Sequence, residues 1–228
     1  GQITIRELEK LDFFEGIPQD ILQNLLNEST VASYKKKEVI FHSRTRTEFV
    51  YFVLSGEVML YNLTKHGNRK VIFILGKGRL LNQSIVSKKP NALFGEAVCP
   101  VQALKIPEGV FLRLMEQCHE LTYSILREYE RNLWRMGHQL KNTTGNMQTE
   151  RKIAAKLWKL GRDFGVETEE GVMVDIDLTI TLMADLVGVP RENVSRACKV
   201  LTDRGLIRYS SKRFILTDFD GLADFYKM

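Results

Sequence analysis

The chain has 228 residues, of which 44% are hydrophobic and 27% charged, as is ordinary for a water-soluble globular fold. It contains no apolar run long enough to span a bilayer and no N-terminal signal-peptide pattern, so we expect no membrane partner. Cys99, Cys118 and Cys198 are dispersed and form no CxxC pair, which argues against a disulfide framework or zinc ribbon and indicates a reducing cytoplasm.

The net charge of +5 is mild, but its distribution along the chain is uneven. Seven Lys or Arg residues lie between Arg191 and Arg213, opposed only by Glu192 and Asp203. The segment 163–185 instead holds seven acidic residues and no basic one. Such segregation is what a one-sided surface facing phosphates requires; the alternative is a charged face in contact with solvent only.

The N-terminal part of the chain is predicted to be a helix followed by short strands. Apolar residues at helical spacing after Pro18 predict a helix over 18–28. Short β-rich runs separated by turn signals then predict an antiparallel β-barrel or jelly roll within residues 34–106. The predicted strands are 39–41, 49–54, 58–61, 71–75, 92–98 and 102–106.

Residues 108–143 contain no proline and are predicted to form a long helix with a coiled-coil seam. A symmetric homodimer is the simplest way to cover such a strip. The alternative is a helix that lies on its own barrel, and Leu121 and Ile125 are expected to face the barrel in either case. The seam residues alternate in steps of three and four: Leu126, Tyr129, Leu133, Met136 and Leu140.

The remaining residues predict a hinge and a smaller C-terminal domain. Residues 142–146 are expected to end the long helix, and a second helix follows with Ile153, Leu157 and Leu160 on one face. An acidic loop is expected over 161–171 and a strand over 172–176. The expected fold class is α+β, with an effector-sensing barrel domain at 1–107, a dimerisation helix and hinge at 108–145, and a winged helix-turn-helix domain at 146–228.

The most informative segment is 178–201, which has the pattern of two helices joined by a tight turn. Gly188 allows a positive φ at the turn, and Pro190 suits the first turn of the second helix. Apolar residues at helical spacing point inward, which leaves a polar outer face. The inward set is Val194, Ala197, Cys198 and Leu201.

The outer face of this second helix carries Arg191, Glu192, Ser195 and Arg196. Arginine donates two bonds to guanine and glutamate accepts from cytosine, each good contact discriminating by roughly 1–3 kcal/mol. A purely electrostatic DNA binder has no use for a carboxylate there, so Glu192 favours sequence reading. The alternative is a solvated helix with a Glu192–Arg196 ion pair. The following hairpin, 206–216, is predicted to be a wing whose basic tip, Lys212 and Arg213, touches phosphate.

With these motifs the chain resembles the CRP/FNR family of bacterial regulators over nearly its full length. The resemblance depends on the segments 53–58 (VLSGEV) and 190–196 (PRENVSR) and on the long helix between them. It implies a cyclic-nucleotide-binding-type barrel, a homodimer, a palindromic operator with TGA-like half-site cores, and RNA polymerase as a partner. It implies that Arg191, Glu192, Ser195 and Arg196 are the base-reading residues. The other predicted DNA-binding residues are Thr179, Thr181, Lys199, Lys212 and Arg213.

The predicted effector region departs from the family's cAMP pattern. The family's Gly-Glu pair is replaced by Asn82 and Gln83, and its Arg-Ser pair aligns best with Asn91 and Ala92. A buried phosphate without a cation is very costly, and Lys88 and Lys89 lie in a loop expected to be exposed. We therefore predict that cAMP is not the ligand. No cysteine precedes Cys99, so an FNR-type iron–sulfur cluster is not expected either.

An uncharged or aromatic small molecule is the predicted effector, bound between barrel and helix, where it would shift the dimer helix or the hinge near Gly145. Haem held by a histidine is the alternative, and control by protein abundance or by oxidation of Cys99 or Cys118 is another. No cofactor is predicted otherwise. The expected effector-binding residues are Leu80, Leu81, Asn82, Gln83, Ala92, Leu93, Trp134, Gly137 and His138; the candidate haem ligands are His42, His66, His119 and His138.

Two other classes of function remain as rivals. A jelly-roll enzyme needs clustered metal ligands or a nucleophile motif, and the sequence has no His-x-His and no Gly-x-Ser-x-Gly, so no catalytic residue is predicted. An architectural DNA binder without sequence preference is the second rival, which salt-dependent binding without operator preference would favour.

Overall fold

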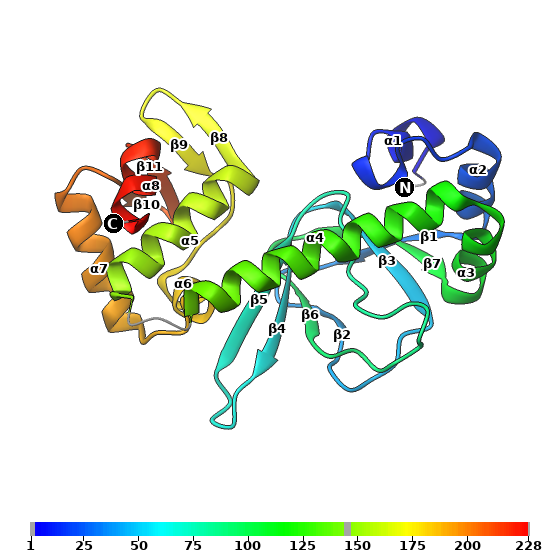
Figure 1. Ribbon diagram of the computed structural model, residues 1–228, viewed down its shortest axis with the longest axis horizontal. Coiled ribbons are helices and arrows are strands. Elements are labelled where there is room, and N and C mark those ends of the chain that lie inside the picture. Colours follow the sequence, from blue (N-terminus) through cyan, green and yellow to red (C-terminus); the bar gives the residue numbers. More distant parts are fainter. Residues whose placement is uncertain (1–2, 144–146, 228) are drawn as a thin grey trace. The chain divides into compact units, whose positions relative to one another are not determined.

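The computed structural model describes residues 3–143 and 147–227, which form two compact units (Figure 1). Of the described residues, the first unit comprises 3–62 and 72–137, and the second 63–71, 138–143 and 147–227. Of the hinge predicted at 142–146, residues 144–146 lie outside the described part of the chain. Among the described residues, no helix combines the length and the apolar character needed to cross a membrane.

The first unit begins with two helices and a 3-10 turn that pack against strands β3 (Phe49–Ser55) and β7 (Val101–Pro107): α1 (Ile5–Glu9), η1 (Asp12–Phe14) and α2 (Gln19–Glu28). The helix predicted over 18–28 is confirmed. Helix α1 was not predicted, although Thr4 and Glu7 form a reciprocal capping box at its start. Its apolar surface is too short to produce a clear helical period, so only the cap signals it.

The predicted antiparallel sheets are confirmed, and they form two separate layers. One sheet has the strand order β1-β7-β3 and the other β2-β6-β4-β5. The sequence missed β1, which pairs with β7 from Thr30↔Lys105 to Tyr34↔Val101. The strands are β1 (Thr30–Tyr34), β2 (Val39–Phe41), β3 (Phe49–Ser55), β4 (Val58–Leu63), β5 (Arg69–Leu75), β6 (Phe94–Ala97) and β7 (Val101–Pro107).

Two hydrophobic clusters divide the buried side chains of this unit. One fills the barrel interior, where the Phe41 ring lies so close to Gly95 that a Cβ there would meet it at 2.7 Å. The other joins the outer side of β3 and β7 to the helices, with Phe13, Phe14 and Phe52 in mutual ring contact. Alternation along β3 explains the division, because Phe52 and Val53 point to opposite faces.

The prediction of one continuous helix over 108–143 is wrong at Cys118. Helix α3 (Glu108–Gln117) ends there, Cys118 is extended (φ −133°, ψ 110°), and α4 (His119–Thr143) begins. The Thr122 hydroxyl donates to the Met115 carbonyl at 2.7 Å, which satisfies one of the carbonyls at the end of α3. The break is invisible in the sequence because the buried residues keep helical spacing across it: Phe111, Leu114, Cys118, Leu121 and Ile125.

The second unit contains a four-stranded sheet of order β10-β11-β9-β8, with helices α5, α6, α7 and α8. Residues Ile153, Leu157 and Leu160 of α5 are buried as predicted. The acidic loop predicted over 161–171 is wrong, because α5 continues to Phe164 and β8 follows. Gly161 is a packing residue, since a Cβ there would meet Leu216 at 2.4 Å. The elements are α5 (Thr149–Phe164), β8 (Gly165–Thr168), β9 (Gly171–Val174), α6 (Ile180–Val187), α7 (Arg191–Asp203), β10 (Arg208–Ser210), β11 (Arg213–Leu216) and α8 (Phe219–Lys227).

Candidate nucleic-acid interface

The turn between α6 and α7 is fixed by local hydrogen bonds and one positive φ. The Thr179 hydroxyl oxygen accepts from the Leu182 N–H at 3.0 Å and caps α6. Gly188 ends α6 with φ +76°, and its N–H donates to the Ala184 carbonyl at 2.8 Å. Pro190 is the N-cap of α7, one position before the first turn where the sequence predicted it. The two helices therefore have the helix-turn-helix arrangement that the sequence predicts.

Helix α7 has a buried face and an exposed face. The four residues predicted to point inward are at most 7% exposed: Val194, Ala197, Cys198 and Leu201. Burial raises the pKa of the Cys198 thiol to about 11, so this cysteine stays protonated at neutral pH. All the predicted base-reading and flanking residues of α7 lie in solvent: Arg191, Glu192, Ser195, Arg196 and Lys199.

Asn193 belongs to this face but was not predicted. Its side-chain carbonyl oxygen accepts from the Arg196 guanidinium at 2.5 Å, three residues away on α7. This bond restricts the orientation of the guanidinium before any DNA arrives. The spacing of three residues on a helix is the sequence signal that could have identified the pair.

The predicted wing is present as the hairpin of β10 and β11. Its two-residue turn is Ser211-Lys212, with positive φ at both positions (51° and 63°), which characterises a type I′ turn. The Lys212 carbonyl accepts from the Leu178 N–H at 2.8 Å, and the Lys212 side chain is exposed. The Phe214 side chain is fully buried and anchors the hairpin. The wing tip thus presents Lys212 to solvent, as predicted.

Arg213, predicted to touch phosphate, is engaged within its own chain, and its contact with DNA stays a prediction. Its guanidinium pairs with the carboxylate of Asp175 and, at 3.2 Å, with that of Asp177. Both acidic residues directly follow β9, the strand next to β11 in the sheet. Arg213 is therefore already neutralised by its own chain.

Two more cations of the basic segment are also engaged. Arg208 pairs with Glu170 at 2.5 Å, and the Arg204 guanidinium lies 5.0 Å from the centroid of the Phe225 ring. The acidic segment 163–185 and the basic segment 191–213 are separate in sequence, but residues of both meet on the sheet β10-β11-β9-β8, which we call the wing sheet. The predicted one-sided basic surface is consequently narrower than the sequence suggested, and it centres on α7 and Lys212.

The predicted effector-binding residues of the barrel are engaged with the chain itself. Asn82 is 6% exposed, and its side-chain oxygen accepts from the Tyr51 N–H at 2.8 Å. Its side-chain nitrogen donates to the Phe49 carbonyl at 2.9 Å and to the Thr47 hydroxyl at 3.3 Å. The Tyr129 hydroxyl donates to the Asn82 carbonyl at 3.3 Å. Asn82 thus ties its loop to β3 and α4 and has little capacity left for a ligand.

Gln83 makes an equivalent internal contact across the same loop. Its side-chain oxygen accepts from the Ala92 N–H at 3.1 Å and from the Leu93 N–H at 3.2 Å. Its side-chain nitrogen donates to the Leu81 carbonyl at 3.2 Å. The two backbone donors at 92 and 93, which could otherwise bind an anion, are occupied by an amide oxygen of the chain.

The predicted lining of the effector pocket is corrected at Leu80 and Leu81. Both are buried, but Leu80 lies in the cluster beneath the helices and Leu81 in the barrel interior, so their side chains do not line one pocket. Leu93 packs against the interior cluster and Ala92 is exposed. Trp134, Gly137 and His138 of α4 are exposed, and their part in closing a pocket remains a prediction.

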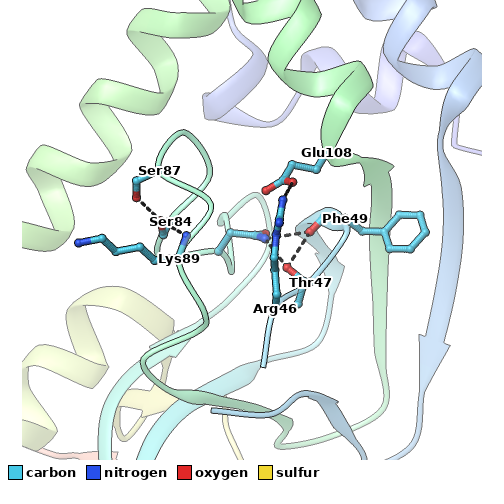
Figure 2. A network of polar contacts seen from close by, with 8 residues as sticks. Arg46, Thr47, Phe49, Ser84, Ser87, Lys89 and Glu108 are labelled. Carbon is cyan, nitrogen blue, oxygen red and sulfur yellow. Dashed lines mark hydrogen bonds and ion pairs between the residues drawn. The ribbon is translucent and has the colours of Figure 1, made fainter. Parts of the chain in front are cut away.

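The loop after Gln83 turns its lysines toward solvent, as predicted. The Ser84 and Ser87 hydroxyls lie 2.7 Å apart, and Ser84 also accepts from the Lys89 N–H at 3.4 Å. Figure 2 shows the Lys89 side chain extending away from Arg46, whose guanidinium pairs with Glu108 at 3.2 Å. Lys89 therefore supplies no cation to the barrel interior, and Lys88 is likewise exposed.

The four candidate haem ligands are exposed, in surroundings that do not resemble a buried haem site: His42, His66, His119 and His138. The His42 ring contacts that of Phe94, with 5.8 Å between the ring centroids. Within the described residues no group of three or more His, Cys, Asp or Glu is placed to hold a metal ion.

The predicted coiled-coil strip on α4 is largely exposed. Leu126, Leu133, Met136 and Leu140 are 52%, 72%, 43% and 65% exposed. Tyr129 is the exception, because it packs against the cluster beneath the helices and donates to the barrel loop. Leu121 and Ile125 face this cluster as predicted. The two alternatives thus concern different faces of the same helix: one face packs against the cluster of its own unit, and the exposed strip stays a predicted dimer seam.

Comparison with known families agrees with both units. The family model for a cyclic nucleotide-binding domain matches residues 31–118, and that for a Crp-like helix-turn-helix domain matches residues 151–225. The two ranges together cover more than half of the chain.

Individual relatives match over most of their length at low identity. The chain is 23% identical over 217 residues to the CRP-like cAMP-activated global transcriptional regulator of Mycobacterium tuberculosis, covering 95% of this chain and 96% of the relative. It is 24% identical over 186 residues to the global nitrogen regulator of Nostoc sp., covering 80% and 83%. The solved structure of FixK2 from Bradyrhizobium japonicum shares the fold, with a TM-score of 0.75 at 19% identity over 86% of this chain and 96% of that one. The first relative is named as a transcriptional regulator and the second as a nitrogen regulator, and neither is named as an enzyme.

Proposed function

The chain belongs to the CRP/FNR family of transcription regulators and carries its DNA-binding helix-turn-helix; on this premise we propose that it reads a palindromic operator as a homodimer. We further propose that an effector other than cAMP controls this binding. The observation that carries the proposal is the exposed face of α7, where Arg191, Glu192, Ser195 and Arg196 all lie in solvent on a helix of suitable size for the major groove.

The half-site is proposed to contain a TGA-like core. Arg191 and Arg196 suit guanine, and Glu192 suits the amino group of the cytosine opposite a guanine. The Asn193 contact supports this assignment, because it holds the Arg196 guanidinium in place before binding. Thr179, Thr181, Lys199 and Lys212 are proposed as phosphate contacts that set the register.

Selection of operators from random duplexes, followed by binding measurements on Glu192→Ala, tests this proposal. The variant is expected to lose preference at one base pair of each half-site, while its affinity for unrelated DNA stays equal or rises. Glu192 also lies in the first turn of α7, where a carboxylate stabilises a helix by about 0.3–1 kcal/mol, so thermal unfolding is measured alongside. Glu167→Ala, an exposed glutamate on β8, is the matched control. Selection that enriches no sequence would refute specific reading and favour an architectural binder.

The dimer is proposed to form along α4. The exposed residues at coiled-coil spacing are Leu126, Glu130, Leu133, Gly137 and Leu140. Of the other residues in the predicted seam, Met136 is also exposed, whereas Tyr129 packs against the cluster beneath the helices. Leu133→Glu places a second charge in this strip and is expected to give monomers at micromolar concentration in sedimentation equilibrium. Val86→Glu changes an equally exposed apolar residue outside the helix and should leave the dimer intact. Dimers of the Leu133→Glu variant would contradict the proposed interface.

A cyclic nucleotide does not fit the barrel residues. Its phosphate needs a cation and backbone donors, but Lys88 and Lys89 are exposed and Gln83 occupies the N–H groups of Ala92 and Leu93. Operator affinity is therefore expected to be unchanged by cAMP, and a cAMP-dependent increase would overturn this part of the proposal. Recruitment of RNA polymerase is proposed from family membership alone.

The control itself is proposed to be a change in the separation of the two α7 helices. These must lie roughly 34 Å apart to enter successive major grooves on one side of the duplex. A ligand needs to favour one arrangement of the dimer by only a few kcal/mol to switch binding. Operator affinity that responds to no ligand and no redox condition would remove the switch and leave a constitutive regulator.

A further inference from the structure

The wing sheet pairs its basic strand with an acidic edge. Strand β11 runs antiparallel to β9, with Ile215 opposite Met173 and Leu216 opposite Val172. Continuing this register places Arg213 opposite Asp175, and Asp177 lies two residues further along the same edge. Opposite charges at such cross-strand positions attract one another. The guanidinium of Arg213 contacts both carboxylates, at 3.2 Å in the case of Asp177.

These ion pairs are open to solvent rather than sealed in a core. The Arg213, Asp175 and Asp177 side chains are 33%, 56% and 38% exposed. Exposed ion pairs contribute little net stability and break readily. A phosphate that approaches the hairpin can therefore reach the same guanidinium that the carboxylates hold, and arginine binds both anions through the same forked geometry.

The hairpin does not depend on these pairs for its shape. Phe214 and Leu216 alternate with Arg213 along the strand and are fully buried. The Leu178 N–H and the Tyr209 hydroxyl add hydrogen bonds of 2.8 Å and 3.0 Å between the hairpin and the segment before α6. Loss of the carboxylates should therefore leave the wing in place.

We propose that Asp175 and Asp177 form an intramolecular counter-charge that competes with DNA phosphate for Arg213 and so limits the affinity of the wing for DNA. The inference rests on the proposed DNA binding and assigns regulation of the same surface to two acidic residues. Each DNA contact by Arg213 first requires the guanidinium to leave its carboxylates. The result is a regulator that binds DNA less tightly than its count of basic residues implies.

The test compares two double variants that raise the net charge equally. Asp175→Asn with Asp177→Asn releases Arg213, whereas Glu167→Gln with Glu169→Gln removes two exposed carboxylates that make no ion pair among the described residues. Binding to a selected operator and to an unrelated duplex is measured across a salt series. The Asp variant is expected to bind both DNAs about 3–10-fold more tightly at low salt, with a salt slope steeper by about one. The Glu variant should change affinity less than about 2-fold, because neither of its carboxylates holds Arg213.

Adding Arg213→Ala to the wild-type chain and to the Asp double variant completes a double-mutant cycle. It should weaken binding only slightly in the wild-type chain and more strongly in the Asp175→Asn, Asp177→Asn background, where the guanidinium is available. The proposal would be overturned if Arg213→Ala reduced DNA affinity equally in both backgrounds, or if the two double variants bound DNA with equal affinity. Should the double variant unfold early, Asp175→Asn and Asp177→Asn are measured singly. Each is expected to raise the affinity by less than the double variant would, and no increase in either would overturn the proposal. A wild-type chain that binds no duplex would instead refute the proposed function itself.

Discussion

Polar side chains in the barrel loop and on α7 differ in what their hydrogen-bonding groups contact. Asn82 and Gln83 lie at positions that suggest a ligand site, yet their amides bind the backbone of β3 and of residues 92–93. Arg191, Glu192 and Ser195 of α7 extend into solvent. The comparison teaches that residue type alone does not distinguish a binding site from a structural contact; the remaining hydrogen-bonding capacity does.

The largest expected effect that tests this contrast is the loss of stability in Asn82→Ala. Three side-chain hydrogen bonds disappear, and the buried N–H of Tyr51 loses its acceptor. The free energy of unfolding is expected to fall by about 2–5 kcal/mol, as measured by urea denaturation. Asn68→Ala, in an exposed turn, should change it by less than about 0.5 kcal/mol. A stable Asn82→Ala variant with altered ligand response would make Asn82 a ligand residue instead.

An intermediate effect is expected on the other side of the comparison, in Arg191→Ala. This change should leave the unfolding transition in place but weaken operator binding by about 1–3 kcal/mol, because a base contact is lost. Fluorescence anisotropy with operator and unrelated duplexes measures the difference. Arg6→Ala removes an exposed arginine of the first unit and serves as the control for net charge. Unchanged operator affinity of Arg191→Ala would remove this residue from the reading face.

The smallest expected effect at neutral pH concerns the tyrosines around the barrel. Burial raises the pKa of Tyr129 and Tyr51 and raises the pKa of Tyr34 to about 12. Each folded pKa lies above the unfolded value of about 10, so the stability is present below pH 10 and is lost as the pH rises toward 12. The free energy of unfolding should fall over this window by at most about 1.4 kcal/mol per pH unit for each tyrosine.

Tyr129→Phe should make this alkaline loss smaller while costing about 1 kcal/mol at neutral pH through the bond to Asn82. Tyr123→Phe, at a tyrosine of α4 that is 63% exposed, is the matched control and should follow the wild type. An identical pH profile for Tyr129→Phe and the wild type would place the alkaline titration elsewhere.

Much of the fold could be predicted from local sequence patterns. Alternating strands, the helical spacing of Val194, Ala197, Cys198 and Leu201, and the positive φ available to Gly188 are set within a few residues. Elements without such signals were missed or misplaced. Cys118 breaks a helix inside an unbroken apolar period, and Gly161 resembles a loop residue although it serves close packing with Leu216.

By itself the sequence determined the antiparallel N-terminal sheets, the helix-turn-helix and the exposed residues of α7, because each depends on periodicity or on one turn geometry. Only the tertiary structure decided which cations and amides remain available. The bonds between Arg213 and Asp175, between Gln83 and residues 92–93, and between Tyr129 and Asn82 join positions that no local pattern relates. Hydrogen-bond and charge satisfaction depend on distances in space, and these are fixed only when strands and helices pack.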